Sequence, residues 1–488
     1  MPQPLLAVAA ALVLLLFAAA AAHGFEIEEA TVASIQLGFH NGSLTSVELV
    51  RFYLDRISRL NPLLHAVIEV NPDALRHAAR ADAERRSSSS GKCGALHGVP
   101  VLLKDNIATR DALNTTAGSF ALLGSVARRD AGNPYVLSAS PCGSSTGSAI
   151  AAAASMAAVT VGTETDGSIL CPASLNSVVG IKPTVGLTSR AGVVPITPRQ
   201  DTVGMASVVG EHGKSPSLDV SYGRPICRTV TDAVLVLDAI VGYDALDAAA
   251  TSTASKYIPD GGYTQFLKKD GLNGKRIGIP NGFFSYANGT VQHTVYQQHI
   301  DTMRKQGAIV IEDLDIANLS VILDSLNNGQ EIALAAEFKL SLNAYLPGLS
   351  YSPVRTLAEI IAFNDAHPVE EKMKKIGQII FLVAENTTGI GAIEKAAISQ
   401  LNKLSADGLE KLMREHELDA VVTPNDSASS VLAMGGMPAI TIPGGYGKLG
   451  VPFGVSFGGL KGYEPRLIEM AYAFEQVTMV RKTPTFLP

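Results

Sequence analysis

Two serines and a lysine are the residues of this chain whose types and spacing could do chemistry. Ser144 and Ser168 lie 24 positions apart in a Gly-, Ala- and Ser-rich stretch over residues 141–174, and Lys104 follows the apolar run 99–103. A serine hydroxyl is a weak nucleophile until a base removes its proton, and a desolvated neutral lysine can be that base. Glycines nearby let backbone amides approach a developing anion. The set therefore predicts Ser–Lys acyl transfer.

Four sequence blocks carry a resemblance to a known family. They are HGVPVLLKDN around Lys104, GSSTGS around Ser144, GTETDGSILCPASLNSVVGIKPT over residues 162–184, and PGGYGKLGVPFGVSFGG near the carboxyl terminus. In these blocks the chain resembles the amidase signature family. The TETDGS run is similar to the peptide-amidase-like branch, which is found in plants and bacteria.

The resemblance implies a function and a role for each residue of the set. It implies hydrolysis of a small-molecule carboxylic amide through an acyl-enzyme, without a cofactor. Ser168 would be the nucleophile, Ser144 a relay held in a cis peptide, and Lys104 the base, whose pKa burial must then depress. An oxyanion hole or substrate-binding role is implied for the segment Thr165, Asp166, Gly167 and Ser168, and more weakly for Ser145.

Two departures from the family pattern bear on folding and activity. Lys104 and Ser144 are 40 positions apart, a few dozen fewer than the family usually has, so one helix–strand unit is predicted to be missing. An extra segment over residues 205–224 has Gly, Ser and Pro punctuation without a period, which is typical of a surface loop. These changes keep open the alternative of a catalytically impaired splice or gene-model variant.

The pattern of short apolar runs between helical segments predicts the fold class. We expect an α/β fold made of one domain over residues 25–488, with its signature core at about 94–241. The resemblance implies a mixed central sheet covered by helices on both faces. A capping box at Thr45 and Glu48 predicts a helix that ends at Pro62. Strands are expected at 99–103, 158–162, 178–181, 276–279, 420–423 and 439–443, and helices at 148–157, 231–241, 291–306 and 467–476.

The amino terminus predicts the compartment. Residues 5–22 are almost continuously apolar and end in small residues, so residues 1–22 are predicted to be a secretory signal peptide; an uncleaved anchor is the alternative. We expect a secreted or endomembrane-lumen glycoprotein with no stable membrane association after cleavage. Four cysteines in 488 residues make no disulfide scaffold, and Cys142 and Cys171 are expected to be small buried thiols. Six Asn-x-Ser/Thr sites fit this route: Asn41, Asn114, Asn288, Asn318, Asn386 and Asn425.

Composition and chain order argue against other functions. The net charge is −6 and no basic block is present, so nucleic acid is not expected as a partner. The sequence has no cluster of His and Cys, so no metal site is predicted. Gly454–Gly458 matches a nucleophile elbow, but no histidine follows Ser456, so a strand and turn are expected there. A non-catalytic amide-binding protein and, more weakly, a tRNA transamidation subunit remain alternatives.

Overall fold

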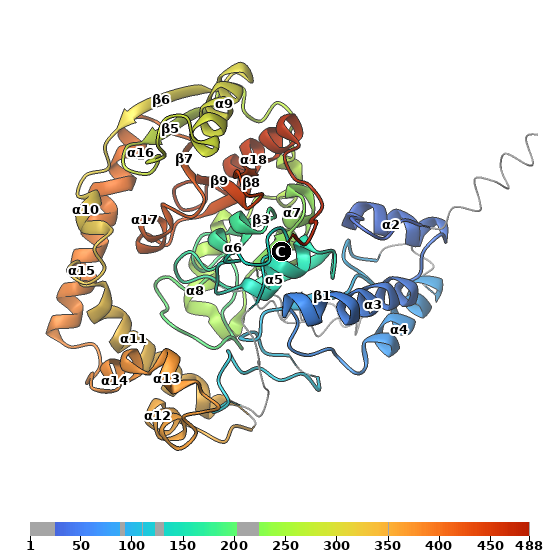
Figure 1. Ribbon diagram of the computed structural model, residues 1–488. Helices are drawn as coiled ribbons and strands as arrows, with labels where there is room; N and C mark the ends of the chain where they lie inside the picture. Colours follow the sequence, from blue (N-terminus) through green and yellow to red (C-terminus); the bar gives the residue numbers. More distant parts are fainter. Residues whose placement is uncertain are drawn as a thin grey trace, which may run out of the picture.

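The central feature of the computed structural model is one mixed sheet (Figure 1). The structure describes residues 25–87, 93–109, 111–122, 131–202, 224–349 and 351–487. Within them the strand order is β1-β2-β4-β3-β8-β9-β7-β5-β6. The pairs β1–β2, β5–β6 and β5–β7 are parallel and the others antiparallel. The mixed sheet predicted from the sequence is therefore confirmed.

The strands and helices have the following bounds. The strands are β1 Val101–Leu103, β2 Val159–Gly162, β3 Val179–Lys182, β4 Arg224–Cys227, β5 Arg276–Pro280, β6 Ile309–Leu314, β7 Ala420–Pro424, β8 Ala439–Tyr446 and β9 Pro452–Gly458. The helices before the long gap in the description are α2 Val32–Asn41, α3 Ser46–Leu64, α4 Ala74–Ser87, α5 Thr146–Ala153 and α6 Leu170–Leu175. Those after it are α7 Val230–Ile240, α8 Ala248–Ala254, α9 Val291–Lys305, α10 Leu319–Ile322, α11 Gln330–Tyr345, α12 Leu357–Ala366, α13 Met373–Ile376, α14 Ile379–Glu385, α15 Ala392–Ser405, α16 Lys411–Glu415, α17 Ser429–Met434 and α18 Glu464–Thr478.

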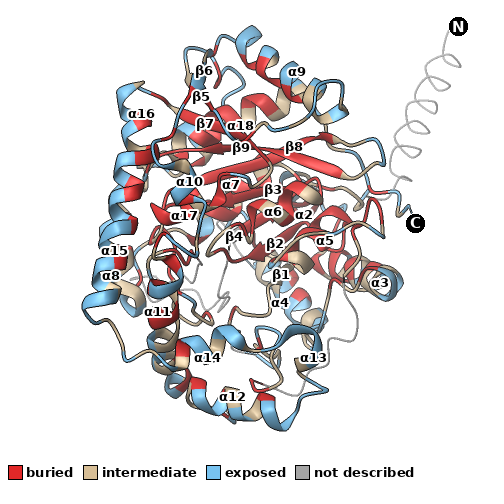
Figure 2. Ribbon diagram, turned by 60° about the vertical axis from the view of Figure 1, so that its left-hand side comes forward, coloured by how far each residue is buried: buried red, intermediate tan, exposed pale blue. Residues whose placement is uncertain are grey.

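Helices cover both faces of the sheet, because the strands are apolar on both sides. In β7, Val422 packs with the core cluster that includes α7 and α18, whereas its neighbour Val421 packs with the cluster that includes α17. Figure 2 shows the central strands as buried. In Figure 1, α10 to α15 form an arc along one side of the molecule, and α2 to α4 lie on the opposite side.

Two local predictions differ from the structure. The capping box at Thr45 and Glu48 is present, but α3 runs through Pro62 to Leu64 instead of ending at the proline. A proline in the last turn removes only one hydrogen bond, and left-handed His65 ends the helix by donating its N–H to Asn61. The strand β4 was not predicted, and it begins at Arg224, where the predicted loop ends.

The edge of the sheet at β1 is relevant to the helix–strand unit that is predicted to be missing between Lys104 and Ser144. Among the described residues, no strand lies beyond β1, which pairs only with β2. The rest of the extra segment, residues 205–223, and the predicted signal peptide lie outside the described residues. No helix in the described ranges has the length and apolar character needed to span a bilayer.

Candidate active site

The strand β1 delivers Lys104 to the site. Lys104 directly follows the strand, and its backbone N–H donates to the Val161 carbonyl of β2 at 3.0 Å. Its Nζ donates to the Ser144 hydroxyl at 2.7 Å and to the Thr163 hydroxyl at 2.9 Å. Asn106 also donates to the Thr163 hydroxyl, at 3.0 Å. In the described chain, the lysine amine therefore donates to two hydroxyl groups and, at 3.4 Å, to the Thr163 carbonyl, and it pairs with no carboxylate.

The environment of Lys104 favours its neutral form. Burial lowers the pKa of Lys104 to about 8, against the opposing attraction of the Glu164 and Asp201 carboxylates. Burial also raises the pKa of Asp201 above its usual value, against three hydrogen bonds from Thr165, Ile196 and Thr197 that lower it. An amine with this pKa is partly unprotonated near neutral pH and can accept a proton.

Ser144 lies at the entrance to α5. The Gly143–Ser144 peptide bond is cis, as the family resemblance implied. The Ser144 side chain is exposed, so a reactant can reach its hydroxyl while Lys104 holds it from the other side.

Ser168 lies on the turn between β2 and α6. Gly167 before it has a φ of +74°, and a Cβ there would come within 3.2 Å of the Ser429 hydroxyl, so the turn requires glycine. The Ser168 carbonyl accepts from the Ser145 N–H at 3.1 Å. Within the described chain, the Ser168 hydroxyl makes no hydrogen bond to Ser144. In the described chain, the hydrogen bond between Lys104 and Ser144 of the predicted relay is formed, and the one between Ser144 and Ser168 is not.

A row of free backbone donors precedes and includes Ser168. Among the described residues, the N–H groups of residues 165–168 have no hydrogen-bond acceptor. The side chains around them are occupied: the Thr165 hydroxyl donates to Asp201 at 2.7 Å, and Asp166 accepts from Ser430 at 2.8 Å. Thr165 and Ser168 line the main cavity, and Asp166 and Gly167 do not. The predicted oxyanion segment can therefore offer backbone donors rather than side chains.

Ser145, the weaker candidate, lines the cavity and is also tied into the fold. It is 1% exposed, and its hydroxyl donates to the Thr163 carbonyl and accepts from the Thr163 N–H. Because its hydroxyl both donates and accepts a hydrogen bond at Thr163, Ser145 holds the start of α5 against the end of β2. These contacts position the site, and the predicted contact of Ser145 with substrate stays a prediction.

Cys142 and Cys171 form a disulfide, so the prediction that they are buried thiols is wrong. Cys142 lies two positions before Ser144, and Cys171 lies three positions after Ser168. Sequence spacing alone could not reveal the pair, because the turn that brings the two segments together depends on the sheet. The disulfide holds both serine-bearing segments side by side.

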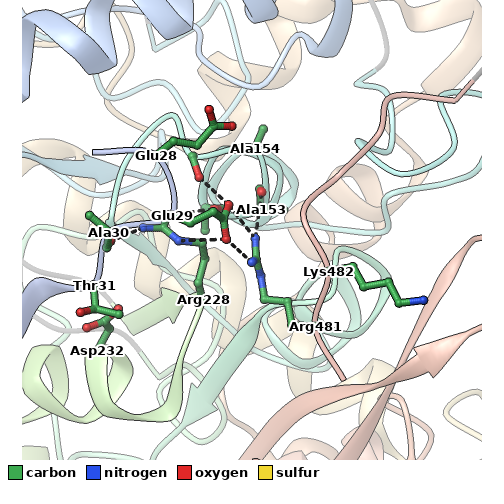
Figure 3. A network of polar contacts seen from close by, with 12 residues as sticks. Glu28, Glu29, Ala30, Thr31, Ala153, Ala154, Arg228, Asp232, Arg481 and Lys482 are labelled. Carbon is green, nitrogen blue, oxygen red and sulfur yellow. Dashed lines mark hydrogen bonds and ion pairs between the residues drawn. The ribbon is translucent and has the colours of Figure 1, made fainter. Parts of the chain in front are cut away.

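The far end of α5 is fixed by arginines (Figure 3). The Arg228 guanidinium donates to the Ala152 and Ala157 carbonyls at 3.2 and 2.9 Å, and Arg481 donates to the Ala153 carbonyl at 3.1 Å. Both arginines pair with Glu29. Cations at a helix carboxyl terminus satisfy its free carbonyls and stabilise its dipole. Glu29 from the amino-terminal segment and Arg481 from the carboxyl-terminal segment thus help to hold α5, the helix that begins two residues after Ser144.

Glu164 is the main site residue that the sequence analysis missed. It is 1% exposed, and its carboxylate accepts from the N–H groups of Ile169 and Leu170 at 2.7 and 3.0 Å. It thereby fixes the backbone directly after Ser168. A charged residue between two polar ones gives no sequence signal of burial. The one available clue was that Glu164 lies inside the TETDGS run, which carries the family resemblance.

One cavity of about 1380 Å³ joins these groups. Lys104, Ser144 and Ser168 line it together with β1. Its outer wall includes the apolar side chains Phe338 and Phe381 from α11 and α14. Among the described residues, no group of His, Cys, Asp or Glu side chains could hold a metal ion. The arrangement can activate a serine by proton transfer and stabilise an oxyanion with backbone amides.

Comparison with known proteins gives a consistent result. The profile of the Amidase family matches residues 48–132 and 131–433. A protein of Arabidopsis thaliana described as a probable amidase is 52% identical over 505 positions, covering 95% of this chain and 93% of that protein. The native peptide amidase of Stenotrophomonas maltophilia has a TM-score of 0.83 and 36% identity, with 95% of this chain and 99% of that one covered. An amidase family protein of Bacillus anthracis has a TM-score of 0.81 and 29% identity, with 93% and 92% covered.

The profile match also locates a departure. The match consists of two pieces that meet at residues 131–132, and this point lies inside the shortened stretch between Lys104 and Ser144. The alignment with the Arabidopsis protein is longer than the 488 residues of this chain. That relative therefore contains residues that have no counterpart here.

Proposed function

Because this chain belongs to the amidase family, we propose that it hydrolyses carboxylic amides through an acyl-enzyme on Ser168. Neutral Lys104 accepts the proton of Ser144 as Ser144 accepts that of Ser168, and the Ser168 oxygen attacks the amide carbon. N–H groups of the segment 165–168 stabilise the oxyanion, and one such donor typically contributes about 3–4 kcal/mol. The family membership supports amide hydrolysis, and the geometry supports these roles.

The remaining steps return every proton. When the carbon–nitrogen bond breaks, Lys104 gives its proton back through Ser144 to the leaving nitrogen, and ammonia or an amine departs. A water molecule then attacks the acyl-enzyme and loses a proton to the same relay. The acid leaves and the Ser168 hydroxyl is restored. The hydrogen bond between Ser144 and Ser168 must form when substrate binds, because catalytic hydrogen bonds often form only in the complex.

One observation carries the proposal: a lysine with a depressed pKa is hydrogen-bonded to the hydroxyl beside a turn of free backbone donors. A fluorophosphonate probe on the full chain tests it. We expect labelling of the wild type and none of Ser168→Ala, with Ser252→Ala, an exposed serine of α8, as the matched control. A folded protein that binds amides but is not labelled would instead be a non-catalytic amide-binding relative.

We also propose that the protein matures in the secretory pathway. The apolar amino terminus and the six glycosylation sites support this, as does the Cys142–Cys171 disulfide, because such bonds persist in oxidising compartments. A fluorescent fusion and an endoglycosidase digestion test it. Cytosolic fluorescence with no mobility shift would contradict the proposal.

A further inference from the structure

The outer face of α14, in the arc of α10 to α15 (Figure 1), is apolar and has no part in the proposed mechanism. The inner face of this short helix packs against α11, where the rings of Phe381 and Phe338 stack with centroids 5.5 Å apart and Ala384 is buried. The other apolar side chains of α14 and one at the end of α13 are between 43% and 70% exposed: Ile376, Ile379, Ile380, Leu382 and Val383. Apolar side chains gathered on a surface mark either a face that another group covers or a site of aggregation.

A glycosylation site follows this face directly. Residues 386–388 are Asn-Thr-Thr. Asn386 caps α14 with a φ of −71° and a ψ of −11°, so it continues the helical path. Counted from Ile379, Asn386 is seven positions along, and Leu382 and Val383 are three and four positions along. Residues at these spacings share one face of a helix, so Asn386 lies on the exposed apolar face.

The direction of the Asn386 side chain places any group attached to it over α14. In a helix the Cα–Cβ bond tilts toward the amino terminus, so a side chain covers the turn before its own Cα. For Asn386, that turn carries Leu382 and Val383. The backbone is fixed there, because the Lys339 amine of α11 donates to the carbonyls of the residues on either side of Asn386, at 2.5 and 3.1 Å. A bulky group on Asn386 therefore covers its apolar neighbours.

The amide of Asn386 is available for modification, and that of Asn425 is not. Asn386 is exposed, and in the described chain its side chain makes no hydrogen bond. The Asn425 side chain accepts from the Gly454 N–H at 2.8 Å and donates to the Tyr286 hydroxyl at 3.3 Å. The fold therefore uses one of these two asparagines and leaves the other to solvent.

We propose that Asn386 carries an N-linked glycan and that this glycan covers the exposed apolar face of α13 and α14. The inference rests on the proposed secretory route, which supplies the sugar donor, an oligosaccharide joined to a lipid diphosphate. The Asn386 Nδ2 atom attacks the anomeric carbon of the donor. A carbon–nitrogen bond forms, the bond from that carbon to the diphosphate oxygen breaks, and the leaving lipid diphosphate takes up the proton that the amide loses. The product is a bulky, hydrated group at the surface.

A glycan suits this face better than a membrane or a second copy of the chain does. Residues 365–385 carry four acids and three lysines, and a surface without a positive excess has no electrostatic attraction to anionic lipids. A second copy would have to bury the Asn386 amide, and burying an amide without a hydrogen-bond partner costs free energy. A glycan uses that amide and remains hydrated on its outer side.

Mapping the modified asparagines tests the first half of the proposal. The full chain is secreted from a eukaryotic host and treated, in heavy-oxygen water, with an enzyme that releases glycans and converts their asparagines to aspartate. We expect mass spectrometry to find the label at Asn386 and not at Asn425. Label at other sites without label at Asn386 would overturn the proposal and leave the secretory route standing. Absence of label from all six sites would contradict both.

A matched pair of variants tests the covering of the face. Thr388→Ala removes the glycosylation site and keeps Asn386, whereas Thr388→Ser keeps the site; Thr388 is exposed. We expect Thr388→Ala to bind about threefold more of an apolar dye than the wild type and to associate in light scattering, and Thr388→Ser to behave as the wild type. Adding Val383→Asp to Thr388→Ala should reverse both changes. Ser43→Ala, which removes the glycosylation site at Asn41, is the control for loss of a glycan elsewhere, and thermal unfolding confirms that each variant is folded.

The outcomes distinguish the occupants of the face. Equal dye binding and association of folded Thr388→Ala and the wild type, with Asn386 glycosylated, would overturn the covering role. A wild-type dimer that Val383→Asp dissociates would identify a second copy as the occupant and overturn the proposal. Binding of the wild type to phosphatidylserine vesicles that Val383→Asp abolishes would identify a membrane and also overturn it. Fluorophosphonate labelling does not depend on the glycan, so it reports on the catalytic proposal alone.

Discussion

The two ends of α5 use their polar groups in opposite ways. Near the amino end, the Ser144 hydroxyl is exposed, and in the described chain the neighbouring N–H groups of residues 165–168 have no hydrogen-bond acceptor. At the carboxyl end, Arg228 and Arg481 saturate the carbonyls and pair with Glu29. Unpaired groups next to a cavity are available for reactants, and saturated groups hold the helix. Substitutions near the amino end of this short helix should therefore affect catalysis, and substitutions near its carboxyl end should affect stability.

The largest effect is expected at the reactive end. Ser168→Ala should lower kcat/KM for any amide substrate by about 10⁴-fold or more, because the nucleophile is lost. The free energy of unfolding should stay within about 0.5 kcal/mol of wild type. Amide hydrolysis and urea unfolding measure the two quantities, with Ser252→Ala as the control. Retained turnover would remove Ser168 from the mechanism.

The opposite pattern is expected at the arginine end. Arg228 is 4% exposed, and Arg228→Ala removes the donor to the Ala152 and Ala157 carbonyls and one of the two arginines that pair with Glu29. Losing one member of a buried pair costs about 3–5 kcal/mol. Urea unfolding should show this loss, while kcat per folded molecule should change less than threefold (about 0.6 kcal/mol). Arg59→Ala, which breaks an exposed pair with Asp55, should cost under about 1 kcal/mol.

The disulfide joins the two serine-bearing segments, so its removal should affect both quantities. The double variant Cys142→Ser and Cys171→Ser opens a link between residues 29 positions apart. Such links typically contribute about 2–4 kcal/mol to stability. We expect that loss in urea unfolding, together with a fall in kcat of about tenfold, because small misplacements are costly to reaction geometry. The half-buried free thiol Cys93 supplies the control, Cys93→Ser, and equal behaviour of the two variants would contradict the role.

The pH profile separates the two ends without any substitution. Lys104 must be neutral to act as base, and burial lowers its pKa to about 8. Activity should therefore rise with pH and level off above about 8, being about 100-fold lower at pH 6. Initial rates of hydrolysis between pH 5.5 and 9.5 check this, together with circular dichroism to exclude unfolding. A rate that is independent of pH from 6 to 9 would exclude Lys104 as the base.

Sequence patterns predicted the layers of the fold and one contact of the site. Apolar runs located seven of the strands that the structure describes, counting the elbow-like Gly454–Gly458 run now seen in β9. The family resemblance was not needed to locate these strands, because buried strands are apolar on both faces. The pairing of Lys104 with Ser144 was expected from the family resemblance, and the 2.7 Å contact agrees with it.

The sequence could not predict contacts that depend on distant packing. The Cys142–Cys171 disulfide and the burial of Glu164 arise from how two turns meet beside β2. The link between Glu29 and Arg481 joins residues 452 positions apart. No local period encodes such a contact, since only the closed sheet brings its partners together.

Gly147 sets a limit on how this protein could acquire new specificities. It lies in the first turn of α5 against the Ala66 backbone oxygen, where an added Cβ would overlap that atom. Any larger residue would therefore shift the start of the helix, next to Ser144. Natural divergence or laboratory selection toward other amides must therefore act on the opposite wall, for example at Phe338 and Phe381, and leave this turn unchanged.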